Sequence, residues 1–313
     1  MHRQFIKSRK RRRIVPKGQI RKALSGFYYV YYEGETYQTR GRGNFRKRKL
    51  TPMVGDYVEF ESTTKTDGIL KELLSRKNEL VRPTVANVDL GIVIMSAIEP
   101  AFSTNLLDRF LITLESKAIE AIIYITKIDL LTEEQIKEVT TLKEQYEKIG
   151  YPVILPELKT NQKAIEELIT YFPNKLTVFM GQSGAGKSTL LNQIAPELDL
   201  KTGVISSALG RGKHTTRHVE LIPLFDGLVA DTPGFSSIDF LDIETEELPE
   251  LFVDFVEVQE LCRFRSCMHR NEPGCQVQKE VSEGRIQAYR YKHYLQYLDE
   301  IENRKPKYNK KEK

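Results

Sequence analysis

Long hydrophobic runs are missing from this sequence of 313 residues, and none approaches the ~20 consecutive apolar residues that a transmembrane helix needs. The amino-terminal stretch also lacks the apolar core of a secretory signal. An organelle transit peptide can begin with many arginines, as this chain does, but this stretch is poor in serine and shows no amphipathic period. The sequence therefore predicts a cytoplasmic protein that does not contact a membrane.

Cysteine is scarce, and the three cysteines, Cys262, Cys267 and Cys275, all lie within fourteen residues. An odd number in a chain without a signal argues against a disulfide framework and favours metal binding. With His269 they give the spacing C-x₄-C-x-H-x₅-C, a complete donor set for a closed, tetrahedral zinc site. We therefore expect one structural Zn²⁺ per chain. Three unrelated thiols are the alternative, while His293 on the last predicted helix is expected to be exposed or to pack rather than to be a ligand.

Acidic residues are absent between His2 and Lys22, where ten Lys or Arg residues occur. A second basic cluster, "RGRGNFRKRK", runs from Arg40 to Lys49. Because the formal net charge is only +5, the basic residues are concentrated in these stretches, which favours a polyanion as partner. Patterned sequence begins near Gly18, so residues 1–17 are predicted to be a basic extension, either disordered or an upstream addition.

Three kinds of pattern divide the rest of the chain, whose 40% hydrophobic residues suffice for buried cores. Residues 18–82 contain short Tyr-, Val- and Phe-rich runs broken by turn residues, which predicts a five-stranded β-barrel of the oligonucleotide-binding type. A plain β domain with a solvated basic loop is the alternative. Residues 83–240 alternate buried strands with helices, which predicts a parallel α/β sheet covered on both faces. Residues 241–313 contain the cysteine cluster and a helix predicted from about Glu283 to Lys305.

A phosphate-binding loop is predicted between an apolar strand and a helix, where "GQSGAGKST" satisfies the pattern G-x-x-x-x-G-K-[ST]. The glycines let backbone N–H groups close around phosphate oxygens, Lys187 neutralises the outer phosphates, and the Ser188 hydroxyl can bind Mg²⁺. The candidate residues of this loop are Gly181, Gln182, Ser183, Gly184, Ala185, Gly186, Lys187, Ser188 and Thr189.

Two further motifs end predicted strands. In "DTPG", Asp231 can hold Mg²⁺ through water, and the N–H of Gly234 can meet a γ-phosphate. In "TKID", formed by Thr126, Lys127, Ile128 and Asp129, the final carboxylate can accept from the ring N–H and exocyclic amine of guanine. Adenine does not present this donor pair, so the motif predicts a guanine nucleotide. A helix-capping aspartate is the alternative.

The stretch "GRGKHTTRHVE" suits a switch loop, in which Thr215 or Thr216 reaches Mg²⁺ when the γ-phosphate is present. The sequence does not choose between these threonines. Many GTPases place a Gln after the glycine that ends this "DTPG" motif, but here Phe235 follows Gly234 and cannot orient water. Intrinsic hydrolysis should therefore be slow, and another group must complete the site, with His214 as the candidate in cis.

These motifs resemble the signature set of the GTPase superfamily in permuted order, with the guanine-reading motif before the phosphate loop. With a β-barrel in front and a Cys/His segment behind, residues 18–305 resemble the circularly permuted small-ribosomal-subunit-dependent GTPase family of bacteria. The motifs that carry the resemblance are "TKID", "GQSGAGKST", "GRGKHTTR", "DTPGFSS" and "CRFRSCMH" with its following Cys.

The resemblance implies a β-barrel, a circularly permuted P-loop GTPase domain and a zinc-binding domain. It also implies a role in late maturation of the small ribosomal subunit. The leading hypothesis is a GTP-bound form that docks on the small subunit and its rRNA, with hydrolysis stimulated by the subunit and promoting release. Ribosomal RNA or protein is then the candidate for completing the site in trans. We expect a monomer. Thr126 departs from the family's usual Asn and removes an amide near the base. Two alternatives are a nucleic-acid chaperone with vestigial hydrolysis and an ATPase or kinase, which Asp129 disfavours.

Overall fold

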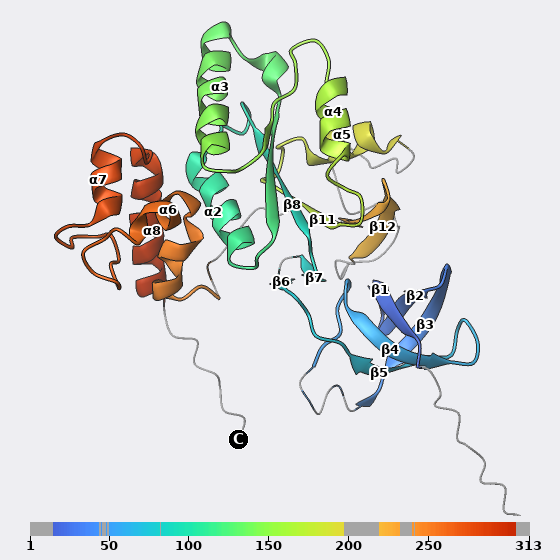
Figure 1. Ribbon diagram of the computed structural model, residues 1–313. Helices are drawn as coiled ribbons and strands as arrows, with labels where there is room; N and C mark the ends of the chain where they lie inside the picture. The colour runs from blue at the N-terminus through green and yellow to red at the C-terminus, as the bar shows by residue number, and fades with distance from the viewer. Residues whose placement is uncertain are drawn as a thin grey trace, which may run out of the picture.

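The computed structural model describes residues 15–43, 45, 48, 50–81, 83–196, 219–231, 240 and 242–304 (Figure 1). Three parts of the chain can be followed in it, namely an amino-terminal barrel, a central α/β domain and a carboxy-terminal helical segment. No helix among the described residues is long and apolar enough to cross a membrane.

The predicted barrel is confirmed and is closed. Its strands are β1 (Lys17–Leu24), β2 (Phe27–Tyr32), β3 (Glu35–Gly41), β4 (Tyr57–Ser62) and β5 (Gly68–Leu73). They pair in the order β1-β2-β3-β5-β4, and β4 pairs back onto β1, so that no edge is left between them. The interior is filled by apolar side chains that alternate along the strands, among them Ile20, Val30 and Phe60.

The central domain begins after a hairpin of β6 (Glu79–Val81) and β7 (Thr84–Ala86). Its strands are β8 (Leu90–Ser96), β9 (Glu120–Thr126), β10 (Val153–Ile154), β11 (Leu176–Met180), β12 (Glu220–Leu224) and β13 (Gly227–Asp231). They lie in the order β10-β9-β8-β11-β13-β12. All are parallel to their neighbours except β12, which runs antiparallel to β13.

Helices cover both faces of this sheet, as the alternation of strand and helix patterns predicts. The helices are α2 (Thr104–Glu115), α3 (Glu133–Lys148), α4 (Gln162–Ile169) and α5 (Lys187–Ile194). In β9, Ile123 and Ile125 pack in the cluster that includes α2 and α3, whereas Ile122 and Tyr124 pack in the cluster that includes α4 and α5. This alternation fixes which side chains of β9 face α5. The predicted capping box of Thr132 and Gln135 opens α3.

The antiparallel strand β12 joins the central sheet to the barrel, which the sequence analysis did not predict. β1 pairs antiparallel with β12 at Lys22 and Glu220, so one sheet continues through both domains. An ion pair of 2.6 Å between the Lys22 ammonium and the Glu220 carboxylate lies at the same point. The barrel is thus attached to β12, the strand that precedes β13. β13 in turn ends at Asp231.

The carboxy-terminal segment contains a 3₁₀ helix (Thr245–Leu251), α6 (Val253–Gln259), α7 (Gln276–Ser282) and α8 (Ala288–Glu302). The expectation of one helix from about Glu283 is wrong at its start, because α7 ends just before it and α8 begins only at Ala288. Gly284 adopts a φ of 73°, a left-handed conformation that ends the preceding helix. The segment has its own aromatic core, in which Ile112 of α2 takes part.

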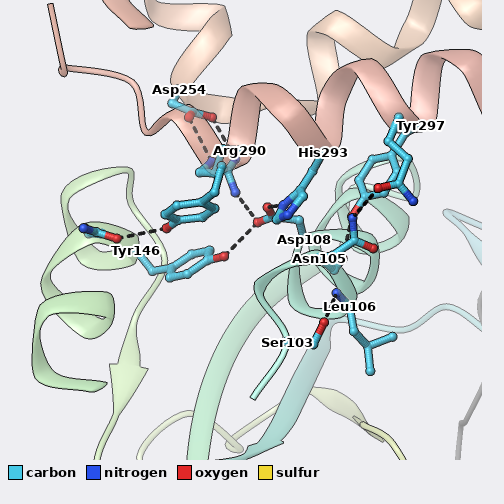
Figure 2. A network of polar contacts seen from close by, with 12 residues as sticks. Ser103, Asn105, Leu106, Asp108, Tyr146, Asp254, Arg290, His293 and Tyr297 are labelled. Carbon is cyan, nitrogen blue, oxygen red and sulfur yellow. Dashed lines mark hydrogen bonds and ion pairs between the residues drawn. The ribbon is translucent and has the colours of Figure 1, made fainter. Parts of the chain in front are cut away.

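A buried polar network fastens α8 to the central domain (Figure 2). The Arg290 guanidinium donates to both carboxylate oxygens of Asp254, at 2.9 and 2.7 Å, and also to Asp108 on α2. Asp108 further accepts from the Tyr146 hydroxyl at 3.0 Å and contacts His293 Nδ1 at 2.6 Å. His293 is therefore a buried packing residue outside the cysteine cluster. Asp108 thus contacts Tyr146 of the central domain and Arg290 and His293 of the carboxy-terminal segment.

Pairing with two carboxylates keeps Arg290, the cation of this network, protonated. Burial alone would lower the pKa of Arg290, but the carboxylates of Asp108 and Asp254 more than offset it and raise that pKa well above its ordinary value. Removing one carboxylate would leave a buried cation with half of its compensation, which costs far more than the loss of an exposed ion pair.

We expect Asp108→Ala to lower the free energy of unfolding by about 3–5 kcal/mol, because Arg290, His293 and Tyr146 lose a partner while buried. Urea unfolding at neutral pH measures this loss. The control is Asp299→Ala, which breaks an exposed ion pair with Arg270 and should cost no more than about 1 kcal/mol. Equal losses for the two variants would show that the buried network does not stabilise the fold.

Candidate functional site

The predicted phosphate loop lies where expected, between the end of β11 and the start of α5. Gly181 has a φ of 144°, and a Cβ there would stand 2.3 Å from the carbonyl oxygen of Ile94. Only glycine fits so close to the β8 backbone. Gly186, with a φ of 90°, is the N-cap of α5, so Lys187 and Ser188 stand in the first turn, where backbone N–H groups attract anions. The Lys187 side chain is buried.

The "TKID" motif touches the phosphate loop. Thr126 ends β9, and its hydroxyl donates to the carbonyl of Ala185 at 2.6 Å. Lys127 adopts a left-handed φ of 60°, and its ammonium donates to the carbonyl of Glu99. The threonine thus holds the loop through the single hydrogen that its hydroxyl can donate. This contact adds to the expectation that Thr126 removes an amide, because the threonine hydroxyl also binds the loop.

A cavity of about 490 Å³ opens between these two motifs. Its wall includes Gly186 and Thr189 from the phosphate loop and all four residues of the "TKID" motif, Thr126, Lys127, Ile128 and Asp129. Two motifs that lie far apart in the chain therefore line one space, and its volume is in the ordinary range for a small-molecule site. The structure brings Asp129 to the same cavity as the start of α5, as the guanine-reading hypothesis requires.

One wall of the cavity was not predicted. It is formed by the loop from Pro156 to Asn161, which follows the two-residue strand β10. Its sequence, "PELKTN", carries no motif that marks it as part of a site. Only the pairing of β10 with β9 brings the loop beside Thr126, because parallel strands present their carboxyl ends at the same edge of a sheet.

The remaining predicted nucleotide residues are described only in part. The backbone of Asp231 ends β13, which lies next to β11. The "DTPG" motif therefore begins at the same sheet edge as the phosphate loop. The residues His214, Thr215, Thr216, Gly234 and Phe235 lie outside the described residues.

The chain that follows the "DTPG" motif contacts both the central domain and the carboxy-terminal segment at Phe240. The Phe240 ring lies under the Arg109 guanidinium of α2, 4.5 Å from its centroid, and edge-on to the Tyr297 ring of α8 at 4.9 Å. The Arg304 guanidinium donates to the carbonyl oxygens of Phe240 at 2.8 Å and Ile243 at 3.2 Å. Phe240 is therefore a fixed point nine residues beyond the described end of β13.

The predicted metal ligands come together. The donor atoms of Cys262, Cys267, His269 and Cys275 all lie within 4.8 Å of one another, and this group could hold a metal ion. His269 Nδ1 stands 3.7 Å from the Cys262 sulfur and 3.4 Å from the Cys275 sulfur. Two ligands of a tetrahedral ion with ordinary S and N bond lengths lie roughly 3.6 Å apart, so the spacing fits such an ion.

The surroundings of the cluster suit thiolate ligands. Backbone N–H groups of Gln276 and Gln278 point at the sulfurs of Cys262 and Cys275, at 3.2 and 3.5 Å. In the absence of a cation, burial raises the pKa of both Cys267 and Cys275 and lowers that of His269. The imidazole is thus kept neutral with a lone pair to offer, and a bound cation would reverse the preference of the thiols for their protonated form.

The loop that carries these ligands is fixed by α8. The Tyr291 hydroxyl donates to the carbonyl of His269 at 2.7 Å, and the Tyr294 hydroxyl donates to that of Met268 at 2.6 Å. Within the loop, the Glu272 carboxylate accepts from the backbone N–H groups of Met268 and Arg270, each at 2.8 Å. The same helix therefore contacts the loop that carries the cysteine cluster, Phe240 and the network around Asp108.

Family models account for most of the chain. The RsgA N-terminal domain matches residues 17–70, and the RsgA GTPase model matches residues 73–241. Among curated proteins, a small ribosomal subunit biogenesis GTPase RsgA of Enterococcus faecalis is 65% identical over 295 residues, which cover 94% of this chain and 98% of that protein. A small ribosomal subunit biogenesis GTPase RsgA 2 of Listeria innocua is 53% identical and covers 93% of this chain and 99% of its own length.

Solved structures give the same picture. The crystal structure of YloQ, a circularly permuted GTPase, is 46% identical and superposes with a TM-score of 0.80 over 96% of this chain and 99% of the other. YjeQ from Thermotoga maritima is 35% identical and has a TM-score of 0.80 over 93% of this chain and 99% of the other. The likeness spans barrel, central domain and cysteine segment together.

Proposed function

Since this chain belongs to the RsgA GTPase family, we propose that its GTP hydrolysis drives a binding and release cycle on the small ribosomal subunit. Membership makes the chain a GTPase of ribosome biogenesis. In the proposed cycle the GTP form docks on the maturing subunit and its rRNA, and hydrolysis promotes release. The observation that carries the proposal is the single cavity lined by Asp129 and the start of α5, because it joins a guanine reader to a phosphate site.

Each residue of the nucleotide site has a role in this proposal. Asp129 accepts from the donor edge of guanine, while the N–H groups of the loop and Lys187 bind the phosphates. Ser188 and Asp231 would hold Mg²⁺, and Thr215 or Thr216 would join them when the γ-phosphate is present. The ion would supply charge neutralisation for the phosphates. The chain's own residues set the position of the base and of the outer phosphate.

Water attack needs a group that Phe235 does not provide. We propose that His214 orients the water once the switch loop is ordered on the subunit, so that the site is complete only in the complex. The alternative within the same cycle is that His214 contacts rRNA and that a group of the subunit acts in trans. Both versions predict slow hydrolysis by the free protein.

The domain junctions suggest how the nucleotide state is passed on. The candidate switch stretch "GRGKHTTRHVE" runs into β12, which pairs with β1 of the barrel. Residues 232–239 connect Asp231 to Phe240, which α2 and α8 hold. Each candidate switch segment is thus joined covalently to a point fixed on another domain. In the proposal, ordering of the two switch segments around the γ-phosphate is transmitted to the barrel and to the cysteine-containing segment.

The metal bound by the cysteine cluster is proposed to be Zn²⁺. Three thiolates and one imidazole are its preferred tetrahedral set, and four protein ligands leave no open position for substrate. The ion would therefore fold the loop rather than take part in hydrolysis. Because α8 holds both this loop and Phe240, a folded zinc segment also fixes the end of the second switch segment.

Asp129→Asn should weaken GTP binding by about 10- to 100-fold, because a charged acceptor for two base N–H groups is lost. The same variant should bind xanthosine nucleotides better than the parent does, since xanthine presents a carbonyl to the new amide. Titration with fluorescent nucleotides measures both. Glu134→Gln makes the same charge change on the exposed start of α3 and should alter neither affinity. Unchanged base preference in Asp129→Asn would remove this residue from the base site.

Cys267→Ser should lower bound zinc from one ion per chain to a small fraction and reduce the thermal stability of the carboxy-terminal segment, because ligand binding is part of its folding free energy. Metal analysis by mass spectrometry and thermal unfolding measure the two effects. The neighbouring exposed Ser266→Ala should retain full zinc. A parent protein free of zinc, or a fully loaded variant, would contradict the proposed centre.

GTP turnover should be slow for the free protein and rise at least about 10²-fold with small ribosomal subunits, because docking completes the catalytic site. Stimulation should fall as salt is raised, since phosphate contacts are screened. Large subunits serve as the control. If His214 orients water, His214→Ala abolishes the stimulation but keeps GTP-dependent docking. Equal stimulation by both subunits, or by neither, would contradict the proposed partner.

A further inference from the structure

One residue that lines the nucleotide cavity carries a buried hydroxyl with no partner among the described residues. Four buried side-chain polar atoms in the described part of the chain lack a hydrogen bond, and one of them is the Tyr124 hydroxyl. Tyr124 is 1% exposed and is the only residue of these four that lines the 490 Å³ cavity. Buried hydroxyls are normally paired, so an unpaired one in a cavity wall indicates a partner that enters with a ligand.

The strand places this hydroxyl on the face that the base occupies in the proposed function. Side chains alternate along β9, so Tyr124 and Thr126 point to the same face of the sheet, toward α5. Ile125, between them, belongs to the cluster on the opposite face. The tyrosine is therefore the residue next to Thr126 on the cavity side of the strand.

Thr126 itself cannot serve the base as a donor. Its hydroxyl carries one hydrogen, which it donates to the carbonyl of Ala185 at 2.6 Å. The carbonyl of Met95, 3.3 Å from the same hydroxyl, is also an acceptor. The donor that an amide would offer at this position is thus missing from the motif, while an unused donor is present two residues earlier in the same strand.

The hydroxyl of Tyr124 is also in the right protonation state to donate. Burial raises the pKa of Tyr124 to about 12, so it keeps its proton at neutral pH. The ring packs in one cluster with Leu190 of α5, Ala164 of α4 and Ile154 of β10, which restricts its movement. A fixed, protonated hydroxyl is a donor for an acceptor that approaches from the cavity.

Guanine has a donor edge and an acceptor edge. Asp129 is an acceptor and can bind only the donor edge, with its ring N–H and amine, which leaves N7 and O6 to be served by donors. We propose that Tyr124 is a base-recognition residue whose hydroxyl donates a hydrogen bond to the N7 and O6 edge of guanine, directly or through one bound water. This assignment rests on the proposed nucleotide site and adds a specificity-determining residue to it.

Tyr124→Phe tests the assignment, because it keeps the ring and its packing and removes only the oxygen. The dissociation constant for GDP should rise about 3- to 10-fold, the usual effect of one hydrogen bond. The melting temperature of the nucleotide-free protein should stay the same or rise, since an unpaired buried oxygen is gone. A residue with only a structural role would not weaken GDP binding while sparing stability.

Tyr146→Phe is the matched control. It removes another buried tyrosine hydroxyl, one that is already paired with Asp108 and does not line the cavity. This variant should lower the melting temperature and leave the GDP dissociation constant unchanged. An unchanged dissociation constant for GDP in Tyr124→Phe would overturn the proposal.

Nucleotide analogues identify the base edge. 7-Deaza-GDP lacks the N7 acceptor, and 6-thio-GDP replaces O6 with a weak acceptor. The parent should bind at least one of them less well than GDP, and Tyr124→Phe should lose that preference. If the variant discriminates against both analogues as strongly as the parent does, the hydroxyl does not serve this edge. In that case Asp129→Asn still switches base preference, whereas failure of the nucleotide site itself would leave Asp129→Asn without effect.

Discussion

The parallel pairing of β11 with β8 on one side and β13 on the other is the constraint on which the nucleotide site depends. β11 leads into the proposed phosphate loop, β9 beside β8 ends in the proposed guanine-reading motif, and β13 ends at Asp231. Because parallel strands present their carboxyl ends at one edge, these motifs meet whatever their order along the chain. The permuted order therefore changes which segments are covalently joined and leaves the arrangement of the site intact.

The two ends of the central domain are joined to their neighbours in different ways. On the barrel side, β1 and β12 meet at one residue pair, Lys22 and Glu220, whose ion pair is partly exposed. On the other side, Asp108 and Arg290 are almost fully buried, and aromatic rings from α8 pack around Ile112 of α2. Breaking the second junction uncovers paired charges and apolar surface together, whereas breaking the first uncovers mainly apolar surface, because barrel residues share a core cluster with the central domain.

What the sequence could predict was set by how local each signal is. The phosphate loop, the metal ligands and the capping box at Thr132 each lie within a short stretch, so spacing alone identifies them. The pairing of β12 with β1 could not be found in this way, because an apolar strand pattern looks the same in parallel and antiparallel neighbours. Nor could Asp108, whose partner Arg290 is 182 positions away. The proposed role of Tyr124 could not be predicted for another reason. Tyr124 lies in an apolar strand, where an aromatic residue is normally interpreted as part of the hydrophobic core.

The pairing of β1 with β12 also determines how a displacement travels through the protein. The strand crossing at Lys22 and Glu220 is accompanied by a backbone bridge between Val54 and Val85, and apolar residues of the barrel and the central domain share one core cluster. A close-packed core resists deformation, so a shift of β12 moves the barrel with it. A load applied to the barrel would therefore reach the strand that precedes Asp231.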